Sequence, residues 1–279
     1  MRVGIDIAQQ RMPWSEIADR ATFADAAGFD SIWGFDHFQP MYGSGPGECF
    51  EGYTMLAALS GLTTRVRLGL LVTGVTYRHP SLLAAEAITV DHASEGRLEL
   101  SLGAAWYEKE HRELGFPFPP TPQRIEMLDE ALTILRGLLT TDGFSFHGRH
   151  FTVDDASLRP RPVQSPTPPL WIGASGERRM LPLVARHADG WHAFGSVDEL
   201  TRKSRLLDDL AADAGRHPAG IVRAAWLDLS RPWSDVRREA EQLAGRGFGL
   251  VIAGWPSEGR AHVEDFATTV LPDLRELTP

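Results

Sequence analysis

The feature that most limits the fold is a regular alternation of short apolar strands with amphipathic helices along the chain. Eight segments have the length and apolar character of buried strands, and a helical pattern follows each one. The expected strands are residues 3–8, 29–34, 66–72, 97–102, 170–173, 189–194, 223–229 and 249–253. Eight such units predict a single α/β domain over residues 1–279, a (β/α)8 or TIM barrel.

Local signals at the ends of the helices agree with this alternation. Pro13 and Pro80 are placed to open helices, and Gly28 is placed to end the first one. Ser196 and Glu199 form a capping box at the start of a long helix. The alternative is a doubly wound open sheet, which normally has a Gly-rich loop after its first strand. Here the first strand is followed by Gln-Gln-Arg at residues 9–11, which favours the barrel.

The alternation is interrupted once, between residues 142 and 169. Residues 144–153 have the pattern of a hairpin that turns at His147 and Gly148, and a Pro-rich connector follows. Because the strand–helix rhythm resumes at Leu170, we interpret this stretch as an insertion before the fifth strand and not as a linker between domains.

Composition excludes several classes of function. The formal net charge of −9 gives no broad basic surface for nucleic acid. No apolar run approaches the roughly 18 residues that a membrane span needs, and the strand-like N-terminus does not resemble a signal peptide. The single cysteine, Cys49, cannot form an internal disulfide, so we expect a protein of the reducing cytoplasm.

Candidate catalytic residues follow the second strand, where the chain reads Asp36-His37 and then enters a polar, Gly-rich loop. In TIM barrels the catalytic groups lie at the carboxyl ends of the strands. An acid and an imidazole at this position are therefore candidates for proton transfer. On these two residues alone, a loop-initiating Asp36 and a solvated His37 explain the sequence equally well.

An anion-binding segment is expected after the fifth strand, at Gly173-Ala174-Ser175-Gly176. Its free backbone N–H groups and the following helix would favour a phosphate or carboxylate. Arg178 and Arg179 are expected in the first helical turn, where their charge opposes the helix dipole unless an anion is bound. A turn with two solvated arginines remains the alternative.

Other kinds of chemistry find little support. The ten histidines show neither H-x-H nor H-E-x-x-H spacing, so we expect no metal site. There is no G-x-S-x-G motif for a serine hydrolase. Tyr77 and Arg78 follow the third strand, where they could stack on a ring and bind an anion, or simply lie at the surface.

Several segments together resemble the bacterial luciferase-like monooxygenase superfamily. They are residues 29–38, 66–72, 78–80, 91–97, 102–106 and 169–173, and the resemblance runs from Met1 to about Gly195. Within this superfamily, Asp-His-Phe-Gln-Pro at 36–40 and Gly-Ala-Ala-Trp at 103–106 are similar to the branch that uses the deazaflavin coenzyme F420 more than to the FMN branch.

The resemblance implies a homodimeric barrel with a flavin-like ring at the carboxyl ends of its strands. It implies a non-proline cis peptide at Leu71-Val72 beneath the ring, a phosphate site at residues 173–176, and a His37 that stabilises or protonates the reduced coenzyme beside Asp36. The residues expected at the cofactor are Leu71, Val72, Thr73, Gly103, Ala104, Gly173, Ala174, Ser175, Gly176 and Arg178.

One departure from this branch bears on the substrate. Its sugar-phosphate dehydrogenases have an acidic residue where this chain has Trp106, so reduction of an organic substrate is expected more than oxidation of glucose 6-phosphate. Trp106, Tyr42, Phe50 and Glu110 are expected at the substrate, although loop packing explains the three aromatic residues too.

The sequence thus predicts hydride transfer between F420 and a small unsaturated, carbonyl or imine compound. One alternative is an FMN-dependent monooxygenase that receives reduced flavin from a separate reductase. The other is a non-catalytic protein that only binds a flavin or F420.

Overall fold

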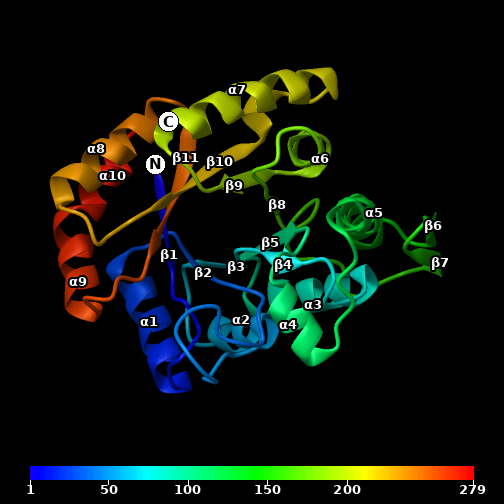
Figure 1. The fold of residues 1–279 in the computed structure, drawn as a ribbon, viewed down its shortest axis with the longest axis horizontal. Helices are drawn as coiled ribbons and strands as arrows, with labels where there is room; N and C mark the ends of the chain where they lie inside the picture. Colours follow the sequence, from blue (N-terminus) through cyan, green and yellow to red (C-terminus); the bar gives the residue numbers. More distant parts are fainter.

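The computed structural model describes residues 1–279 and shows a closed barrel of eight parallel strands surrounded by helices (Figure 1). Around the ring the strands follow the order β3, β2, β1, β11, β10, β9, β8, β5, and pairing of β3 with β5 closes it. Their bounds are β1 Arg2–Asp6, β2 Ser31–Gly34, β3 Arg67–Leu70, β5 Leu98–Gly103, β8 Leu170–Gly173, β9 Gly190–Ala193, β10 Val222–Leu227 and β11 Phe248–Gly254. The predicted TIM barrel is confirmed, with a two-residue strand β4 (Thr73–Gly74) outside the ring.

The helices occupy most of the predicted positions. Their bounds are α1 Trp14–Ala27, α2 Gly52–Ser60, α3 Pro80–Ala93, α4 Glu108–Leu114, α5 Thr121–Thr140, α6 Met180–His187, α7 Val197–Asp213, α8 Trp233–Ala244, α9 Arg260–Thr269 and α10 Leu271–Glu276, with a 3₁₀ turn at Pro218–Gly220. Gly28 ends α1 at a φ of 96°, which a residue with a side chain rarely adopts. The Ser196 side chain caps α7 by accepting the backbone N–H of Glu199. None of the helices combines the length and apolar character that crossing a bilayer requires.

Two places depart from the plain strand–helix alternation. The chain after β5 first forms the short helix α4, which begins at Glu108, before the longer α5. After β11, α9 ends before Val270 and α10 follows directly. Pro272 explains this break, because proline has no N–H to continue the α9 hydrogen-bond ladder.

The interior of the barrel is filled by large apolar side chains. Trp33 on β2 and Trp171 on β8 meet edge to face with ring centroids 5.7 Å apart, and they pack with side chains of β10 and β11. Since β2 and β8 are not neighbours in the ring, this contact lies inside it. A second, larger core lies between the strands and the surrounding helices. A cavity can therefore open only where the strands end.

The insertion forms the predicted hairpin between α5 and β8. Its strands β6 (Phe144–His147) and β7 (Thr152–Ala156) are antiparallel and project beyond α5 (Figure 1). The turn lies later than predicted, after His147. The connector is fastened to the barrel by Asp91, a buried residue of α3 that accepts the backbone N–H groups of Val163 at 2.7 Å and Gln164 at 3.0 Å.

Candidate functional site

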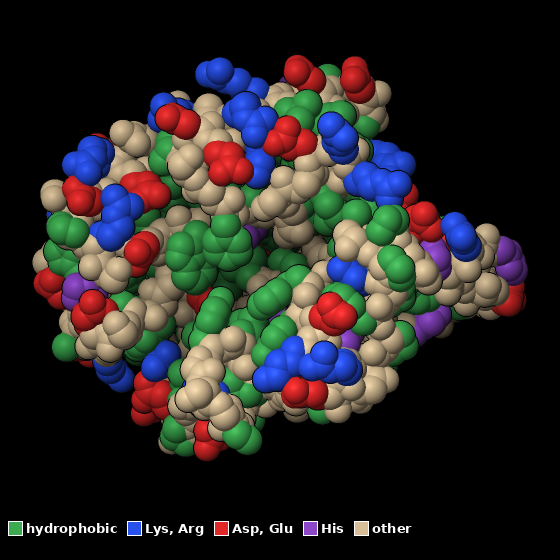
Figure 2. Space-filling view, in the orientation of Figure 1, with side chains coloured by type: hydrophobic (Ala, Val, Ile, Leu, Met, Phe, Trp, Pro, Cys, Tyr) green, Lys and Arg blue, Asp and Glu red, His purple; other side chains and the backbone are tan.

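A cavity of about 1120 Å³ opens at the carboxyl ends of the barrel strands. In Figure 2 it is the central hollow, and hydrophobic side chains surround it. Most of the residues predicted at the site line this cavity. They are Asp36, His37, Tyr42, Leu71, Val72, Thr73, Gly103, Ala104, Trp106, Gly173, Ala174 and Ser175. The structure thus brings the segment after β2 and the segment after β8 around one cavity, as the barrel topology requires.

Four other predicted residues do not line the cavity. Phe50 faces α1, where its ring meets the edge of Trp14 at 5.8 Å, so it lies in a separate surface hollow and not at the substrate pocket. Glu110 is fully buried behind His37. Gly176 and Arg178 are exposed beyond the lining segment.

Asp36 belongs to a buried cluster of charged side chains. Arg78 donates to both oxygens of Asp36, at 2.7 and 3.0 Å, and the backbone N–H of Gly74 donates at 3.0 Å. The same guanidinium reaches Glu51 at 3.0 Å and Glu86 at 3.2 Å. Burial raises the pKa of Glu86 to about 7, and burial outweighs Arg78 in raising the pKa of Asp36. Three carboxyl groups therefore share one arginine, which fixes Asp36 in place.

His37 belongs to a different network, although it is the next residue. Its Nδ1 lies 2.9 Å from Oε2 of Glu110, and the hydroxyl of Tyr77 donates to the same oxygen. Oε1 of Glu110 accepts the backbone N–H groups of Phe38 at 2.7 Å and Gln39 at 2.8 Å. No group of the protein bonds to Nε2 of His37, so this is the nitrogen available to a ligand in the cavity.

Glu110 therefore has a different role from the predicted one. It was expected to contact substrate, but its side chain is 0% exposed and all its partners are protein groups. Burial opposes its ionisation, yet hydrogen bonds from His37, Tyr77 and the Phe38 amide lower the pKa of Glu110. An ionised Glu110 accepts from Nδ1 of His37 and holds the ring in one orientation. No sequence pattern indicated this role, because α4, which carries Glu110, is too short to be recognised from the sequence.

The floor of the cavity between these networks and β8 is formed by Val72. The peptide bond between Leu71 and Val72 is cis, as the family resemblance implied. Gly103 at the end of β5 and Gly173 at the end of β8 lie against the Val72 side chain. A Cβ at Gly103 would be 2.6 Å from Cγ2 of Val72, and one at Gly173 would be 2.9 Å from Cγ1. Only glycine fits at both positions.

The predicted anion-binding segment lies beside this floor. The backbone N–H of Ala174 is used by the carbonyl of His192, but those of Ser175 and Gly176 donate to no group of the protein. Helix α6 begins only at Met180, so Arg178 and Arg179 lie in the turn before it and not in its first turn. Both arginines are exposed and pair with no carboxylate of the chain.

The other end of the cavity is lined by residues that were not predicted at the site. They are Asp6 at the end of β1, His192 and Phe194 at the end of β9, Trp226 on β10 and Trp255 after β11. Gln9, in the segment after β1, does not line the cavity, because its side chain bonds the backbone of Phe35. The first strand was predicted to continue to Ala8, so Asp6 was not recognised as a residue at the end of a strand.

Exposed aromatic side chains surround the mouth of the cavity. Tyr42 is 67% exposed, and Trp106 and Phe194 are each 61% exposed. No other Trp, Tyr or Phe side chain is among the exposed large hydrophobic residues of the chain, and all three line this cavity. Such a concentration of exposed apolar surface marks a binding site. No group of three or more His, Cys, Asp or Glu residues is arranged to hold a metal ion.

Comparisons with known proteins give the family. The sequence model of the luciferase-like monooxygenase family matches residues 1–249, well beyond the part in which the resemblance was expected. An F420-dependent glucose-6-phosphate dehydrogenase from Microbacterium testaceum is 32% identical, and the match covers 80% of this chain and 65% of that protein, slightly less than two thirds. A protein of the same name from Intrasporangium calvum is 31% identical over 99% of this chain and 100% of its own.

Two other similar proteins use different cofactors from each other. An FMNH2-dependent dimethylsulfone monooxygenase from Pseudomonas putida is 27% identical, over 95% of this chain and 75% of that protein. A solved structure, an F420-dependent secondary alcohol dehydrogenase in complex with an F420-acetone adduct, has the same fold, with a TM-score of 0.88, 18% identity and 99% of both chains covered. On the family match and the relatives above 30% identity, this chain belongs to the luciferase-like monooxygenase family.

Proposed function

We propose that this protein is an F420-dependent oxidoreductase that transfers a hydride between the deazaflavin and a small organic compound with an unsaturated, carbonyl or imine group. The observation that carries the proposal is the shared cavity, which is lined by Val72, by Ser175 with its free backbone N–H, and by His37 with its unbonded Nε2. The two F420-dependent relatives above 30% identity support the choice of coenzyme.

The residues present fit a deazaflavin. The cavity exceeds the range of about 300–1,000 Å³ that is typical of ligand pockets, so it has room for a coenzyme and a substrate. Leu71, Val72 and Thr73 would hold the ring, and Gly103 and Gly173 leave space for it to approach the backbone. The amides of Ser175 and Gly176 would bind a phosphate. The coenzyme, when bound, supplies or accepts the hydride.

The chain's own contribution to the reaction is a proton at Nε2 of His37. Glu110 fixes the ring through Nδ1, which leaves Nε2 directed to the cavity. Imidazole exchanges a proton near neutral pH and can therefore protonate a substrate atom or stabilise charge beside the coenzyme. Asp36 is held by Arg78 and has a positioning role. Tyr42, Trp106 and Phe194, at the mouth of the cavity, exclude water from the bound substrate.

The Pseudomonas putida relative favours one second candidate, an FMN-dependent monooxygenase that uses O2 and a partner reductase. Titration with each cofactor separates the two. We expect micromolar or tighter F420 binding, FMN binding at least tenfold weaker, and anaerobic reoxidation of reduced F420 by enones, imines or ketones. The opposite preference, with activity only in the presence of O2, would overturn the proposal. Binding of F420 without turnover of any such compound would indicate a non-catalytic binding protein.

We also propose that the protein is a homodimer and lies in the cytoplasm. Sedimentation of the purified protein tests the dimer, and a monomer at micromolar concentration would contradict it.

A further inference from the structure

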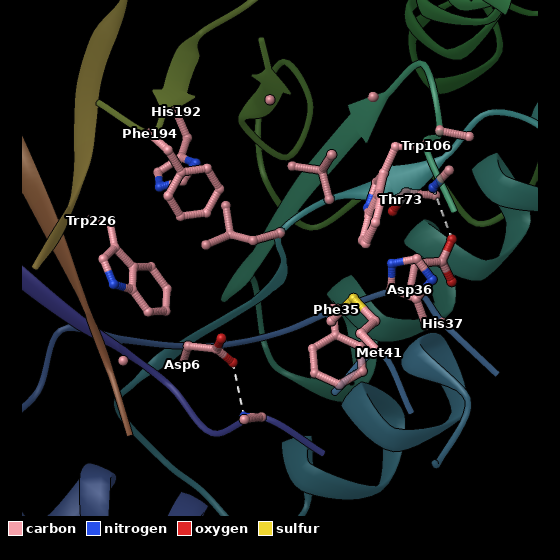
Figure 3. Close-up of a pocket in the computed structure, with 18 of the residues that line it drawn as sticks. Asp6, Phe35, Asp36, His37, Met41, Thr73, Trp106, His192, Phe194 and Trp226 are labelled. Atoms are coloured by element: carbon pink, nitrogen blue, oxygen red, sulfur yellow. Dashed lines mark hydrogen bonds between the residues drawn. The ribbon is translucent and has the colours of Figure 1, made fainter. Parts of the chain in front are cut away.

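Half of the cavity wall has no role in the function proposed above. The ring order places β3, β5 and β8, which carry the predicted cofactor residues, next to one another. β2, which leads into Asp36 and His37, adjoins β3 on the same side, and the remaining arc consists of β9, β10, β11 and β1. We call its cavity-lining residues the far end: Asp6, His192, Phe194, Trp226 and Trp255. Figure 3 shows Asp6, His192, Phe194 and Trp226 across the cavity from Asp36, His37 and Trp106.

The aromatic part of the far end forms a continuous surface. The rings of His192 and Phe194 are 4.9 Å apart, and those of Phe194 and Trp226 are 5.6 Å apart. Trp226 lies over Gly254, where an added Cβ would be only 2.3 Å from the indole. Gly254 pairs in register with Asp6 on β1. The aromatic surface therefore extends to the Asp6 carboxylate and suits an apolar, ring-bearing ligand.

The polar groups of the far end lack partners. His192 is 3% exposed, and its Nε2 is buried without any hydrogen bond. Asp6 accepts one backbone N–H, that of Ala8 at Oδ1, and nothing bonds its other oxygen. The indole N–H of Trp255 is also buried and unpaired. Buried polar groups without partners are costly and uncommon, so these groups point to a ligand that satisfies them.

The charges of the cavity exclude one class of ligand. Arg20 is the only Lys or Arg that lines it. Its guanidinium is already bonded to Glu16 at 2.8 Å and to the carbonyl of Ile7 at 3.1 Å, and it stacks on Trp255 at 4.4 Å. Asp6 has no comparable hydrogen-bonded cation. An anionic substrate group at the far end would therefore meet a carboxylate and no free positive charge.

We propose that the far end is a substrate-recognition subsite for an uncharged, ring-bearing molecule whose hydroxyl or amide N–H donates to Asp6, and that it rejects phosphorylated and carboxylated compounds. That this molecule is a substrate rests on the proposed function, whereas its binding at the far end does not. The aromatic rings of Phe194 and Trp226 hold its apolar body, and His192 meets its second polar group. This subsite separates the chain from its relatives that are named for a sugar phosphate.

Calorimetry with three matched enones tests the proposal, with and without bound F420. The compounds are 4-phenylbut-3-en-2-one and its para-hydroxy and para-carboxy derivatives. We expect the hydroxy compound to bind at least tenfold more tightly than the carboxy compound, because an ionised group next to Asp6 is repelled. In Asp6→Asn the difference should fall below threefold. Trp226→Phe should weaken all three compounds, and exposed Asp198→Asn should change nothing.

Two controls keep the outcomes distinct. Thermal melting shows that each variant folds, and F420 fluorescence shows that its coenzyme affinity stays within threefold. The proposal is overturned if the carboxy compound or glucose 6-phosphate binds as tightly as the hydroxy compound, if none of the enones binds, or if Asp6→Asn keeps the original ranking or weakens F420 instead. If the ranking holds but reduced F420 is never reoxidised, the proposed function fails and the subsite stands.

Discussion

The two ends of the cavity have opposite chemistry (Figure 3). At the near end, formed by Asp36, His37 and the residues behind them, Asp36, Nδ1 of His37 and Glu110 have hydrogen-bonded partners in the protein, and the unbonded Oε2 of Glu86 lies 3.2 Å from Arg78. At the far end, the Nε2 of His192 and the N–H of Trp255 have none, and Asp6 has a single backbone donor. A site whose groups satisfy one another is formed before any ligand arrives. A site whose groups remain unpaired depends on its ligand.

This difference indicates that the near end positions the reacting groups and that the far end recognises the substrate. The near end keeps His37 in one orientation, which chemistry requires. The far end gains hydrogen bonds only when a ligand of the right type is bound, which gives specificity. Variants of the near end should therefore lose stability or rate, whereas variants of the far end should alter substrate choice and cost little stability.

The largest effect is expected when the near end loses its cation. Arg78→Gln leaves Asp36, Glu51 and Glu86 buried or half-buried without a counter-charge, so the free energy of unfolding at pH 8 should fall by about 3–5 kcal/mol. The cost should shrink as the pH falls through about 7, where Glu86 becomes neutral. Urea denaturation measures both. Arg246→Gln, at a half-exposed and weakly paired position, is the control. A loss below 1 kcal/mol would show that the cluster does not hold this end together.

Next in size is the loss of the proposed proton donor. His37→Gln keeps a side chain of similar length but cannot exchange a proton, so kcat/KM for reduced F420 and an enone should fall about 10²- to 10³-fold. The dissociation constant of F420 should change less than threefold. A steady-state assay and a fluorescence titration give the two numbers. Equal losses in binding and turnover would make His37 a binding residue only.

A smaller effect is expected from the residue that positions His37. Glu110→Gln should lower kcat/KM about 10- to 100-fold and leave the dissociation constant of F420 within threefold, because a neutral amide holds Nδ1 of His37 less firmly than a carboxylate does. A steady-state assay and a fluorescence titration give the two numbers. An equal loss of F420 affinity would indicate that Glu110 acts only by supporting the Phe38 and Gln39 backbone.

The smallest effect is expected at the far end, where the substitution should raise the free energy of unfolding and not lower it. Burial raises the pKa of Asp6 to about 6, so ionisation disfavours the folded state. The stability associated with neutral Asp6 is fully present below about pH 4 and is lost as the pH rises through 6. Two pKa units correspond to roughly 3 kcal/mol, but Asp6 is only partly buried and water screens much of this. Asp6→Asn should therefore be more stable than the wild type by about 1 kcal/mol at pH 8 and equal to it at pH 4. Destabilisation at pH 8 would mean that Asp6 is a structural residue like Asp36.

The fold and the near end could be predicted because their signals are local. The strand–helix alternation gives the barrel, and Asp36 and His37 stand where a strand stops. The glycines beside Val72 also belong to short segments at strand ends. Each of these features is visible within a few residues, and the topology alone brings them together.

The far end could not be predicted, because its members come from four distant segments and have no common pattern. Asp6 is the last residue of an ordinary strand, and Trp226 resembles a core residue until Gly254 is seen beneath it. The hydrogen-bond partner of His37 could not be identified from the sequence either. The bond between His37 and Glu110 spans 73 residues and depends on α4, a helix too short to stand out in the sequence.

Hydride transfer with a deazaflavin in this cavity can be followed with an isotope label. Reduced F420 with both C5 hydrogens replaced by deuterium is mixed with the protein and the para-hydroxy enone without oxygen, and the product is analysed by mass spectrometry. We expect deuterium in the product and no need for O2. Product without deuterium, or an oxygen atom from O2 in the product when reduced FMN is supplied, would rule out the proposed reaction.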